Sequence, residues 1–295
     1  GRKLLPYGLL LPAIVALVMF SVYPFASGIW YSFTNISYIG DKAHLVGLAN
    51  YQRILAGDVG AARFFRQALE HSVVWTVAVV AGQFAMGLLT ALVLNEKFPA
   101  RALFRTAILV PIAIPTVVLA LTWEWLYDPL YGPINFCLQH LGLLHGPKAW
   151  VGQPNSPIWP LMIVAIWRGF PFMGVMLLSG LQGIQADLYE AARVDGANVV
   201  HRFRYVTLPQ LRTTITIAVM LHVIWWWNHF DIIRIMGSGG GQFSYESMTL
   251  PILAWYEAFA WSHLSRGAAI SIVSMLALSL ILVWNVRREI RSVRT

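Results

Sequence analysis

The sequence predicts an all-α integral membrane protein that crosses the bilayer six times. Hydrophobic residues make up 58% of the 295 residues, charged residues make up 12%, and the mean hydropathy is +0.62. A soluble domain carries about 25% charged residues, because it needs a polar surface around its core. This composition excludes a soluble enzyme, a disordered chain and a secreted disulfide scaffold. The single cysteine, Cys137, cannot form an internal disulfide.

Six apolar stretches are long enough to cross about 30 Å of hydrocarbon at about 1.5 Å per residue. They cover residues 8–31, 72–95, 104–126, 158–181, 213–234 and 266–286. The first stretch follows Arg2 and Lys3 but has no convincing small-residue cleavage site, so we expect a retained helix and not a signal peptide. Pro111 and Pro115 lack backbone donors and predict a kink in the third stretch, which is either a gate or a static bend.

The distribution of Lys and Arg predicts that both termini are cytoplasmic. Thirteen of the 21 basic residues then lie in inside segments, where positive residues collect in membrane proteins. The formal charge of +8 therefore indicates topology and not a nucleic-acid partner. The same orientation makes 32–71 an external loop with room for a short surface helix, 127–157 a second external loop, and 182–212 a cytoplasmic loop. A loop as long as the last one is usually functional inside a compact bundle.

This cytoplasmic loop predicts a short helix between Asp187 and Gly196. Asp187 is the expected N-cap, and Glu190 follows three residues later, as in a capping box. Ala191 and Ala192 favour a helix and add little bulk, while Gly196 can adopt the left-handed conformation that ends one. The helix should therefore have one nearly flat face, which suits either a groove on another protein or the lipid surface.

The loop also carries a family signature. Glu190-Ala191-Ala192, then Gly196 after three residues, then Val206-Thr207-Leu208-Pro209 after nine more, resemble the EAA signature of ABC importer permeases, EAA-x3-G-x9-I-x-L-P, with Val206 in place of Ile. Over nearly the whole chain the resemblance is to the carbohydrate-uptake branch, of the maltose or glycerol-phosphate type. It is carried further by Val46 to Tyr51, Trp123 to Asn135, Phe172 to Gly183, and the run Asn228 to Asp231 before Gly239 to Gly241, where Gln242 stands in place of the usual Pro.

The resemblance implies a type I ABC importer permease, with residues 1–295 as a single transmembrane domain and 182–212 as a coupling loop that docks on a cytoplasmic ATPase. It assigns this coupling to Glu190, Ala191, Ala192, Asp195, Gly196, Leu208 and Pro209. It further implies a complex in a bacterial plasma (inner) membrane, made with a second related permease, two ATPase subunits and an external substrate-binding protein. The chain contains no G-x-x-x-x-G-K-[ST] phosphate loop, so we expect it to be neither an enzyme nor a cofactor-binding subunit. ATP and Mg²⁺ are then expected on the partner ATPases.

The fifth stretch carries an aromatic and polar face. The spacing i, i+3, i+4, i+7 places four residues on one side of a helix, namely His222, Trp225, Trp226 and His229. Rings offer stacking area to a sugar, and imidazoles offer hydrogen bonds. Packing against neighbouring helices and an interfacial tryptophan belt are the structural alternatives. The resemblance implies that this face contacts the sugar.

Arg168, Gly169 and Phe172 share a face of the preceding stretch, and the resemblance places them at the same site. An Arg within a span costs roughly 2.5–3.5 kcal/mol, so Arg168 should face a cavity or a partner. It can donate to a sugar, bind a phosphate, or bond to helix carbonyls. Asn228 and Asp231 are further candidates for the substrate path, and Asp231 is expected to pair with a basic group near the external end.

The sequence thus predicts the membrane-spanning permease subunit of an ATP-driven importer of a di- or oligosaccharide. Glycerol phosphate or a phosphodiester is the second candidate substrate, because of Arg168. An ATPase-independent secondary transporter or channel is a rival class, which predicts inverted repeats and a buried acidic ion site. A membrane enzyme predicts clustered nucleophiles or metal ligands, whereas the eight His are scattered and form no H-E-x-x-H motif.

Overall fold

The computed structural model describes residues 5–56, 62–153, 156–237 and 247–294. Within these ranges the chain forms helices and no strand, and Thr34 and Leu45 form an isolated antiparallel bridge. The all-α expectation is therefore confirmed. The chain divides into two compact units, residues 1–70 with 249–295 and residues 71–248, which are described separately below.

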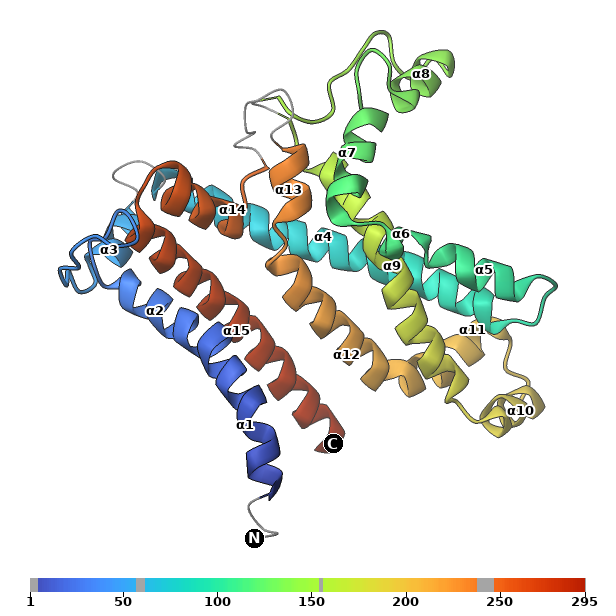
Figure 1. Ribbon diagram of the computed structural model, residues 1–295. Coiled ribbons are helices and arrows are strands. Elements are labelled where there is room, and N and C mark those ends of the chain that lie inside the picture. Colours follow the sequence, from blue (N-terminus) through green and yellow to red (C-terminus); the bar gives the residue numbers. More distant parts are fainter. Residues whose placement is uncertain (1–4, 57–61, 154–155, 238–246, 295) are drawn as a thin grey trace. The chain divides into compact units, whose positions relative to one another are not determined.

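The first unit contains two spanning helices. Its elements are α1 (Leu5–Leu17), the π-helical turn η1 (Val18–Val22), α2 (Tyr23–Ser32), α3 (Ala49–Ala56), the start of α4 (Ala62–Asn95), α14 (Leu250–Trp255), the π-helical turn η5 (Tyr256–Ala260) and α15 (Leu264–Arg294). Helices α1, η1 and α2 form one continuous span, and α2 packs along α15 (Figure 1). The α3 helix is the short surface helix expected in the first external loop.

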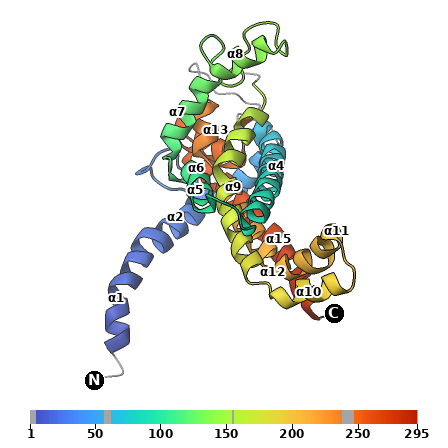
Figure 2. The same ribbon diagram turned by 90° about the vertical axis from the view of Figure 1, so that its right-hand side faces the viewer.

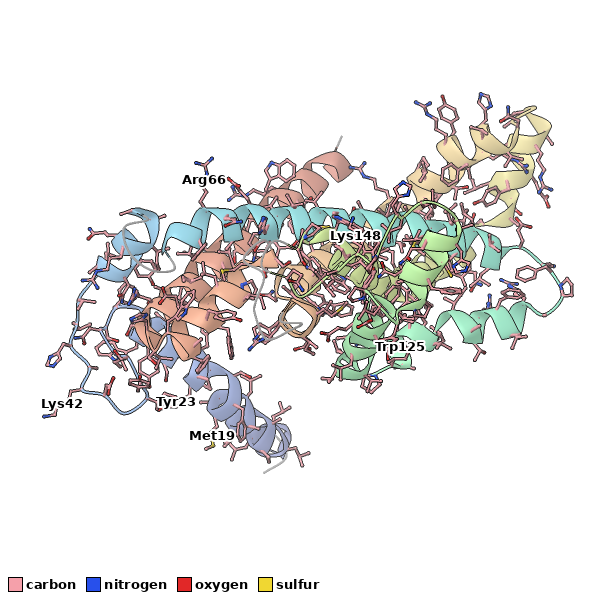
Figure 3. The ribbon with its side chains drawn as sticks, turned by 90° about the horizontal axis from the view of Figure 1, so that it is seen from above. Met19, Tyr23, Lys42, Arg66, Trp125 and Lys148 are labelled. Atoms are coloured by element: carbon pink, nitrogen blue, oxygen red, sulfur yellow. The ribbon has the colours of Figure 1, made fainter. Side chains whose placement is uncertain are left out.

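Large apolar side chains cover the outside of the first span. No residue is buried in the most apolar 18-residue stretch of this span, which lies within Leu9–Ser32. Met19 and Tyr23, for example, project freely from it in Figure 3. An exposed apolar surface of this extent requires a lipid or protein environment, which agrees with a membrane-spanning segment.

The second unit contains the remaining spans and the loop that the sequence predicts to be cytoplasmic. Its elements are the rest of α4, α5 (Arg101–Ile108), α6 (Val110–Ala113), α7 (Thr116–Leu126), α8 (Pro133–His140), α9 (Trp159–Gln182), α10 (Ala186–Val194), α11 (Val199–Arg202), the π-helical turn η2 (Phe203–Thr207), α12 (Leu208–Trp227) and α13 (Asp231–Met236). In Figure 2, α8 lies at one end of this unit, and α10 and α11 lie at the opposite end.

The third span is broken, as its two prolines predict. Helices α5 and α6 are followed by α7 at an angle of 93°, and the break falls at Ile114 and Pro115. Ile114 has an extended backbone, because the residue before a proline avoids the helical region. Pro111, in contrast, sits in the first turn of α6, where a missing N–H costs little.

The number of spans differs from the expectation. Among the described residues, four helices are long and apolar enough to cross a membrane, and the broken pair makes five. The predicted stretch 213–234 is not one helix, since α12 ends at Trp227 and α13 starts at Asp231. Gln210, Arg212 and His222 lower the hydropathy of α12 most, so it does not meet the same criterion. The count of six therefore stays a prediction.

A π-helical turn lets the chain enter α12 through Pro209. Pro209 has no N–H to give to the preceding turn. Leu208 N–H bonds to the carbonyl of Phe203, five residues back instead of four, and this wider turn absorbs the defect. Pro209 thus lies in the first turn of α12, as expected, but the helical path already begins at α11. The η1 turn precedes Pro24 in the same way.

Close helix packing holds the second unit together. A Cβ atom on Gly87 of α4 would lie 2.9 Å from the backbone nitrogen of Gly174 on α9, so only glycine permits this approach. Such small residues drive helix association in lipid, where apolar burial offers little. Around this contact, α4, α9 and α12 share a buried cluster of Ala91, Leu94, Met173, Leu177, Leu178, Leu181, Leu211 and Ala218.

The segment 127–157, predicted to be the second external loop, is ordered around Asn135. The Asn135 amide donates to the carbonyls of Asp128 and Lys148, at 3.0 and 3.1 Å, and accepts from Lys148 N–H at 3.1 Å. Tyr127 donates its hydroxyl proton to the Pro160 carbonyl at 3.2 Å, and burial raises the pKa of Tyr127 to about 12, so it remains a donor. The helix α8 is an element that the sequence interpretation did not foresee.

Candidate functional site

A cavity of about 430 Å³ lies between three helical segments of the second unit. Its wall consists of Ile112, Thr116, Arg168, Gly169, Phe172, His222, Trp225, Trp226 and His229. Seven of the nine residues predicted for the substrate path therefore line one cavity. Its volume lies within the range of roughly 300–1,000 Å³ that is usual for small-molecule sites.

Aromatic rings form one side of this cavity. The Phe172 ring on α9 lies 5.1 Å from the Trp225 ring and 5.8 Å from the His222 ring on α12, measured between centroids. Trp225 is 51% exposed, so its face is free to receive a flat ligand. Aromatic faces in a cavity wall favour a solute with apolar ring faces.

His222 is fixed by a residue that the sequence interpretation missed, Gln83 of α4. The Gln83 amide nitrogen donates to the Ala165 carbonyl at 2.8 Å, so its oxygen must accept. His222 Nδ1–H donates to this oxygen at 2.5 Å. In a neutral imidazole the other nitrogen, Nε2, is then an acceptor, and it has no partner among the described residues. Both Gln83 and His222 are buried, so the pair is well shielded from water.

Gly169 allows Gln83 to reach this position. A Cβ atom on Gly169 would lie 2.5 Å from the Gln83 Cδ atom, so any other residue here would displace the Gln83 amide. Gln83 could have been noticed from the sequence as a carboxamide in the middle of an apolar span, since polar groups at that depth are costly and usually have a function.

Arg168 satisfies a backbone group at the helix break. Its Nη1 donates to the carbonyl of Ile114 at 2.9 Å. This was one of the structural roles expected for Arg168, and the structure combines it with a place in the cavity wall. Ile112 and Thr116, on either side of the break, line the same cavity.

The opposite end of the aromatic face is held by Trp75 of α4. Trp75 is buried and donates its indole N–H to the Trp226 carbonyl at 3.0 Å. Its ring stacks on His229 at 6.2 Å, and the rings of His229 and Trp226 are 4.5 Å apart. His229 Nε2 has no hydrogen-bond partner within the part of the chain that the structure describes.

Two of the predicted path residues lie away from the cavity. The Asn228 amide donates to the Ile224 carbonyl at 2.9 Å, at the end of α12, and Asp231 is an exposed residue in the first turn of α13. Neither belongs to the cavity wall. The glycine run at 239–241 and Gln242 lie outside the described residues.

The predicted coupling residues gather on and around α10. Glu190, Ala191 and Ala192 lie on the helix, and Gly196 has a φ of +79°. The Gly196 N–H bonds to the Arg193 carbonyl, and the Ala197 N–H bonds to the Ala192 carbonyl, which is the Schellman ending expected here. Asp195 is the C-cap residue, and Leu208 and Pro209 open α12.

The predicted N-cap of α10 is wrong by two positions. Gln185 is the N-cap residue, with an extended backbone and no side-chain bond, and Asp187 lies inside the first turn. There its negative charge still interacts favourably with the helix dipole, which explains why an acidic residue suits this place.

A direct bond joins α10 to the start of α12. The hydroxyls of Tyr189 and Thr207 are 3.0 Å apart, so this bond ties α10 to η2, the turn that leads into α12. The sequence interpretation did not single out either residue. Several apolar side chains nearby are exposed, including Val194 at 88%, and the others are Leu188, Val199, Val200 and Tyr205. Exposed apolar groups on a short helix are typical of a protein-docking surface.

Comparison with known proteins identifies the family. Residues 83–293 match the family described as "Binding-protein-dependent transport system inner membrane component". The trehalose/maltose transport system permease protein MalF of Thermococcus litoralis is 35% identical over 95% of this chain and 92% of that protein. The sulfoquinovosyl glycerol transport system permease protein SmoG of Agrobacterium fabrum is 33% identical over 99% of this chain and 92% of that protein.

Solved structures agree on the fold. A bacterial ABC transporter involved in the import of the acidic polysaccharide alginate contains a chain that superposes with a TM-score of 0.80, at 19% identity, over 98% of this chain and 96% of that one. A methionine ABC transporter, MetNI, matches over 78% of this chain with a TM-score of 0.53. The fold is that of a type I ABC importer permease, and the relatives are named as permease components and not as catalytic subunits. From its sequence match and its fold, the chain belongs to the inner-membrane permease components of binding-protein-dependent ABC transport systems.

Proposed function

We propose that this chain, with a second permease, forms the path by which a di- or oligosaccharide crosses the membrane. The observation that carries the proposal is the cavity in which Phe172 and Trp225 present aromatic faces beside the acceptor nitrogen of His222. Sugar rings have apolar faces that stack on aromatic rings and hydroxyl groups that donate hydrogen bonds. The names of the two relatives refer to transport of trehalose or maltose and of sulfoquinovosyl glycerol, which supports a sugar.

Arg168 is the feature that favours the second candidate, glycerol phosphate or a phosphodiester. It is a cationic side chain in the cavity wall. One of its guanidinium nitrogens already donates a hydrogen bond to Ile114, which reduces its capacity for bidentate hydrogen bonding to a phosphate. The uncharged solute is therefore preferred. An ATPase-independent transporter or channel is disfavoured by the family match.

In this proposal, ATP hydrolysis on partner subunits supplies the energy for transport. Helix α10 docks on one of two cytoplasmic ATPase subunits, where ATP and Mg²⁺ bind, and this chain itself binds no nucleotide. The exposed apolar group around Val194 supports such docking, and the Tyr189–Thr207 bond supports transmission to α12. The residues 182–212 then act as the coupling loop of a single permease domain.

The orientation follows from the same assignment. If α10 is cytoplasmic, so are both termini, and the end of the second unit that carries α8 is external. An external substrate-binding protein delivers the sugar there. A related alginate transporter has been solved in complex with its alginate pentasaccharide-bound periplasmic protein, which supports this arrangement.

The test is a solute panel. The complex of this chain with its partner permease, ATPases and binding protein is reconstituted in proteoliposomes, and ATP turnover is measured with maltose, trehalose, longer maltodextrins and glycerol 3-phosphate. We expect a saccharide to raise turnover and glycerol 3-phosphate to leave it at the basal rate. Stimulation by glycerol 3-phosphate alone would reverse the order of the two candidates. Solute flux without any ATP hydrolysis would contradict both.

A further inference from the structure

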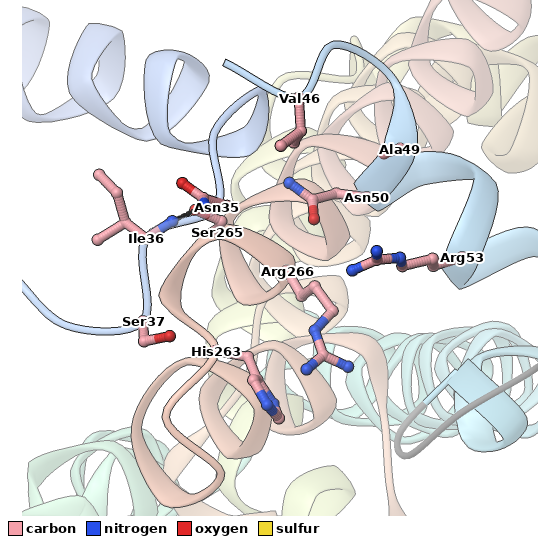
Figure 4. A pocket seen from close by; sticks show the side chains of 10 residues that line it. All are labelled: Asn35, Ile36, Ser37, Val46, Ala49, Asn50, Arg53, His263, Ser265 and Arg266. Atoms are coloured by element: carbon pink, nitrogen blue, oxygen red, sulfur yellow. Dashed lines mark hydrogen bonds between the residues drawn. The ribbon is translucent and has the colours of Figure 1, made fainter. Parts of the chain in front are cut away.

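A second cavity, unrelated to the substrate path, lies in the first unit. It has a volume of about 350 Å³ and is shown in Figure 4. Its wall consists of Asn35, Ile36, Ser37, Val46, Ala49, Asn50, Arg53, His263, Ser265 and Arg266. Three basic side chains thus face one small space.

The basic groups outnumber the acidic ones. His263 bonds to the Glu257 carboxylate at 2.9 Å, and the Arg266 guanidinium lies 3.8 Å from the same carboxylate. The Glu257 side chain is 3% exposed, so this one negative charge is buried, and it already interacts with His263 and Arg266. Arg53 has no hydrogen bond or ion pair with any residue that the structure describes, and its guanidinium points towards Arg266 across the cavity in Figure 4. Two guanidinium groups that share a space favour an anion between them.

The wall of the cavity is held in place by buried hydrogen bonds. Asn50 of α3 donates to the carbonyls of Ser32 and Thr34, at 2.9 and 2.7 Å. Ser265 of α15 accepts from Ile36 N–H at 2.8 Å and lies 3.0 Å from the Thr34 hydroxyl. These bonds fix α3 and the 33–50 segment against the start of α15, so the cavity is preformed.

The cavity lies where two membrane spans end. The apolar span of the first helix ends at Ser32, and that of α15 begins at Leu264. At about 1.5 Å per residue, Arg266 lies roughly 3 Å inside the end of its span. Exposed aromatic and apolar side chains flank this level, including Trp30, Tyr38 and Ile39. Such a belt marks the headgroup region of a bilayer, in which lipid phosphates are the abundant anions.

We propose that this cavity binds the phosphate group of an anionic phospholipid, with Arg53 and Arg266 as its ligands. Guanidinium groups bind phosphate oxygens by paired, charge-assisted hydrogen bonds, and the cavity is large enough for a phosphodiester headgroup whose acyl chains remain in the bilayer. The lipid then ties the external segment 33–53 to the start of α15. The inference does not depend on the proposed substrate.

The test uses the full chain purified in a neutral detergent, with thermal unfolding followed by intrinsic fluorescence. Dioleoyl-phosphatidylglycerol is added, and dioleoylglycerol, which has the same acyl chains and no phosphate, is the lipid control. Inorganic phosphate at the same concentration tests for a soluble anion. The variant is Arg53→Gln, chosen because Arg53 is exposed and has no partner to lose. Lys42→Gln removes the same charge from the same segment, at a residue outside the cavity (Figure 3).

We expect phosphatidylglycerol, but not dioleoylglycerol, to raise the unfolding temperature of the wild type and of Lys42→Gln. In Arg53→Gln this rise should fall to less than half, while the unfolding temperature without lipid stays unchanged. An equal rise in both variants would overturn the proposal, as would an equal rise with inorganic phosphate. If Arg53→Gln kept the lipid effect and instead weakened capture of the binding protein, the cavity would hold a protein carboxylate and the lipid assignment would be wrong.

Discussion

Arg168 Nη1 donates a hydrogen bond of 2.9 Å to the carbonyl oxygen of Ile114, the residue at which the third span breaks. A broken helix in a membrane leaves carbonyls without donors, and an Arg in a span needs acceptors. Each group therefore satisfies the other, which explains why both features coexist in one unit. Since Ile112 and Thr116 line the cavity on either side of the break, this bond also shapes the proposed substrate site.

Arg168→Gln should destabilise the second unit. The shorter side chain loses the part-buried bond to Ile114, and a net contribution of about 0.5–1.5 kcal/mol is typical of one hydrogen bond. Thermal unfolding of the purified complex should therefore occur at a lower temperature than in the wild type. Arg105→Gln, an exposed change on the same broken span, is the matched control and should leave the temperature unchanged. Equal unfolding temperatures in all three proteins would mean that the bond contributes nothing.

Gly169→Ala should weaken solute binding without unfolding the protein. The new Cβ displaces the Gln83 amide, and His222 loses the acceptor that fixes its tautomer. A lost hydrogen bond of about 0.5–1.5 kcal/mol corresponds to a rise of about 2- to 12-fold in the solute concentration that half-saturates transport. The matched control is Gly28→Ala, where an added Cβ meets nothing within 4 Å. If both variants transport with wild-type affinity, Gln83 does not position His222 for the solute.

Trp225→Ala should reduce the affinity for the sugar. Loss of a stacking face costs about 0.5–1.5 kcal/mol, or about 2- to 12-fold in affinity. Trp125→Ala is the control, because Trp125 is also exposed and points away from the ribbon in Figure 3. The neighbouring Trp227 is unsuitable for comparison, since it is buried and its loss leaves a cavity in the core. Equal uptake by the Trp225 and Trp125 variants would remove the case for stacking.

Tyr189→Phe should lower the efficiency of coupling. The change retains the ring but removes the hydroxyl that meets Thr207, so α10 can move without moving η2. The number of solute molecules transported per ATP hydrolysed should fall about 2-fold or more, in line with one hydrogen bond. Tyr205→Phe removes an exposed hydroxyl for which the structure gives no hydrogen bond, and it should leave the ratio intact. A decrease of the same size in both variants would point to a general effect of the loop.

Local patterns allowed much of this molecule to be predicted from its sequence. The EAA signature located α10 and its Gly196 ending, and the helical period placed His222, Trp225, Trp226 and His229 in one wall, because each depends on residues that are close in the chain. Pro115 likewise placed the break of the third span, because Pro acts on its own helix, whereas Pro111 lies in the first turn of α6 without breaking it.

The parts that could not be predicted depend on contacts between distant residues. Gln83 and His222 are 139 positions apart, and Arg168 and Ile114 are 54 positions apart. The helical period of a sequence does not indicate which polar side chains form contacts between packed helices. Two errors at helix termini have a different cause, namely the N-cap expected at Asp187 and the end of α12 at Trp227. Several neighbouring residues can end a helix almost equally well, so its exact boundary is hard to predict from sequence.

The most direct measurement of the central claim is solute-stimulated ATP hydrolysis by the reconstituted complex with Glu190→Lys. Glu190 is exposed on α10, where the account places the ATPase contact. Glu70→Lys reverses an exposed charge near the start of α4, at a residue that does not line the same cavity as Glu190, and is the control. We predict that Glu190→Lys abolishes the stimulation while membrane insertion persists and the Glu70 variant responds like the wild type. Full stimulation in Glu190→Lys would contradict the role of α10 as the link to the ATPase.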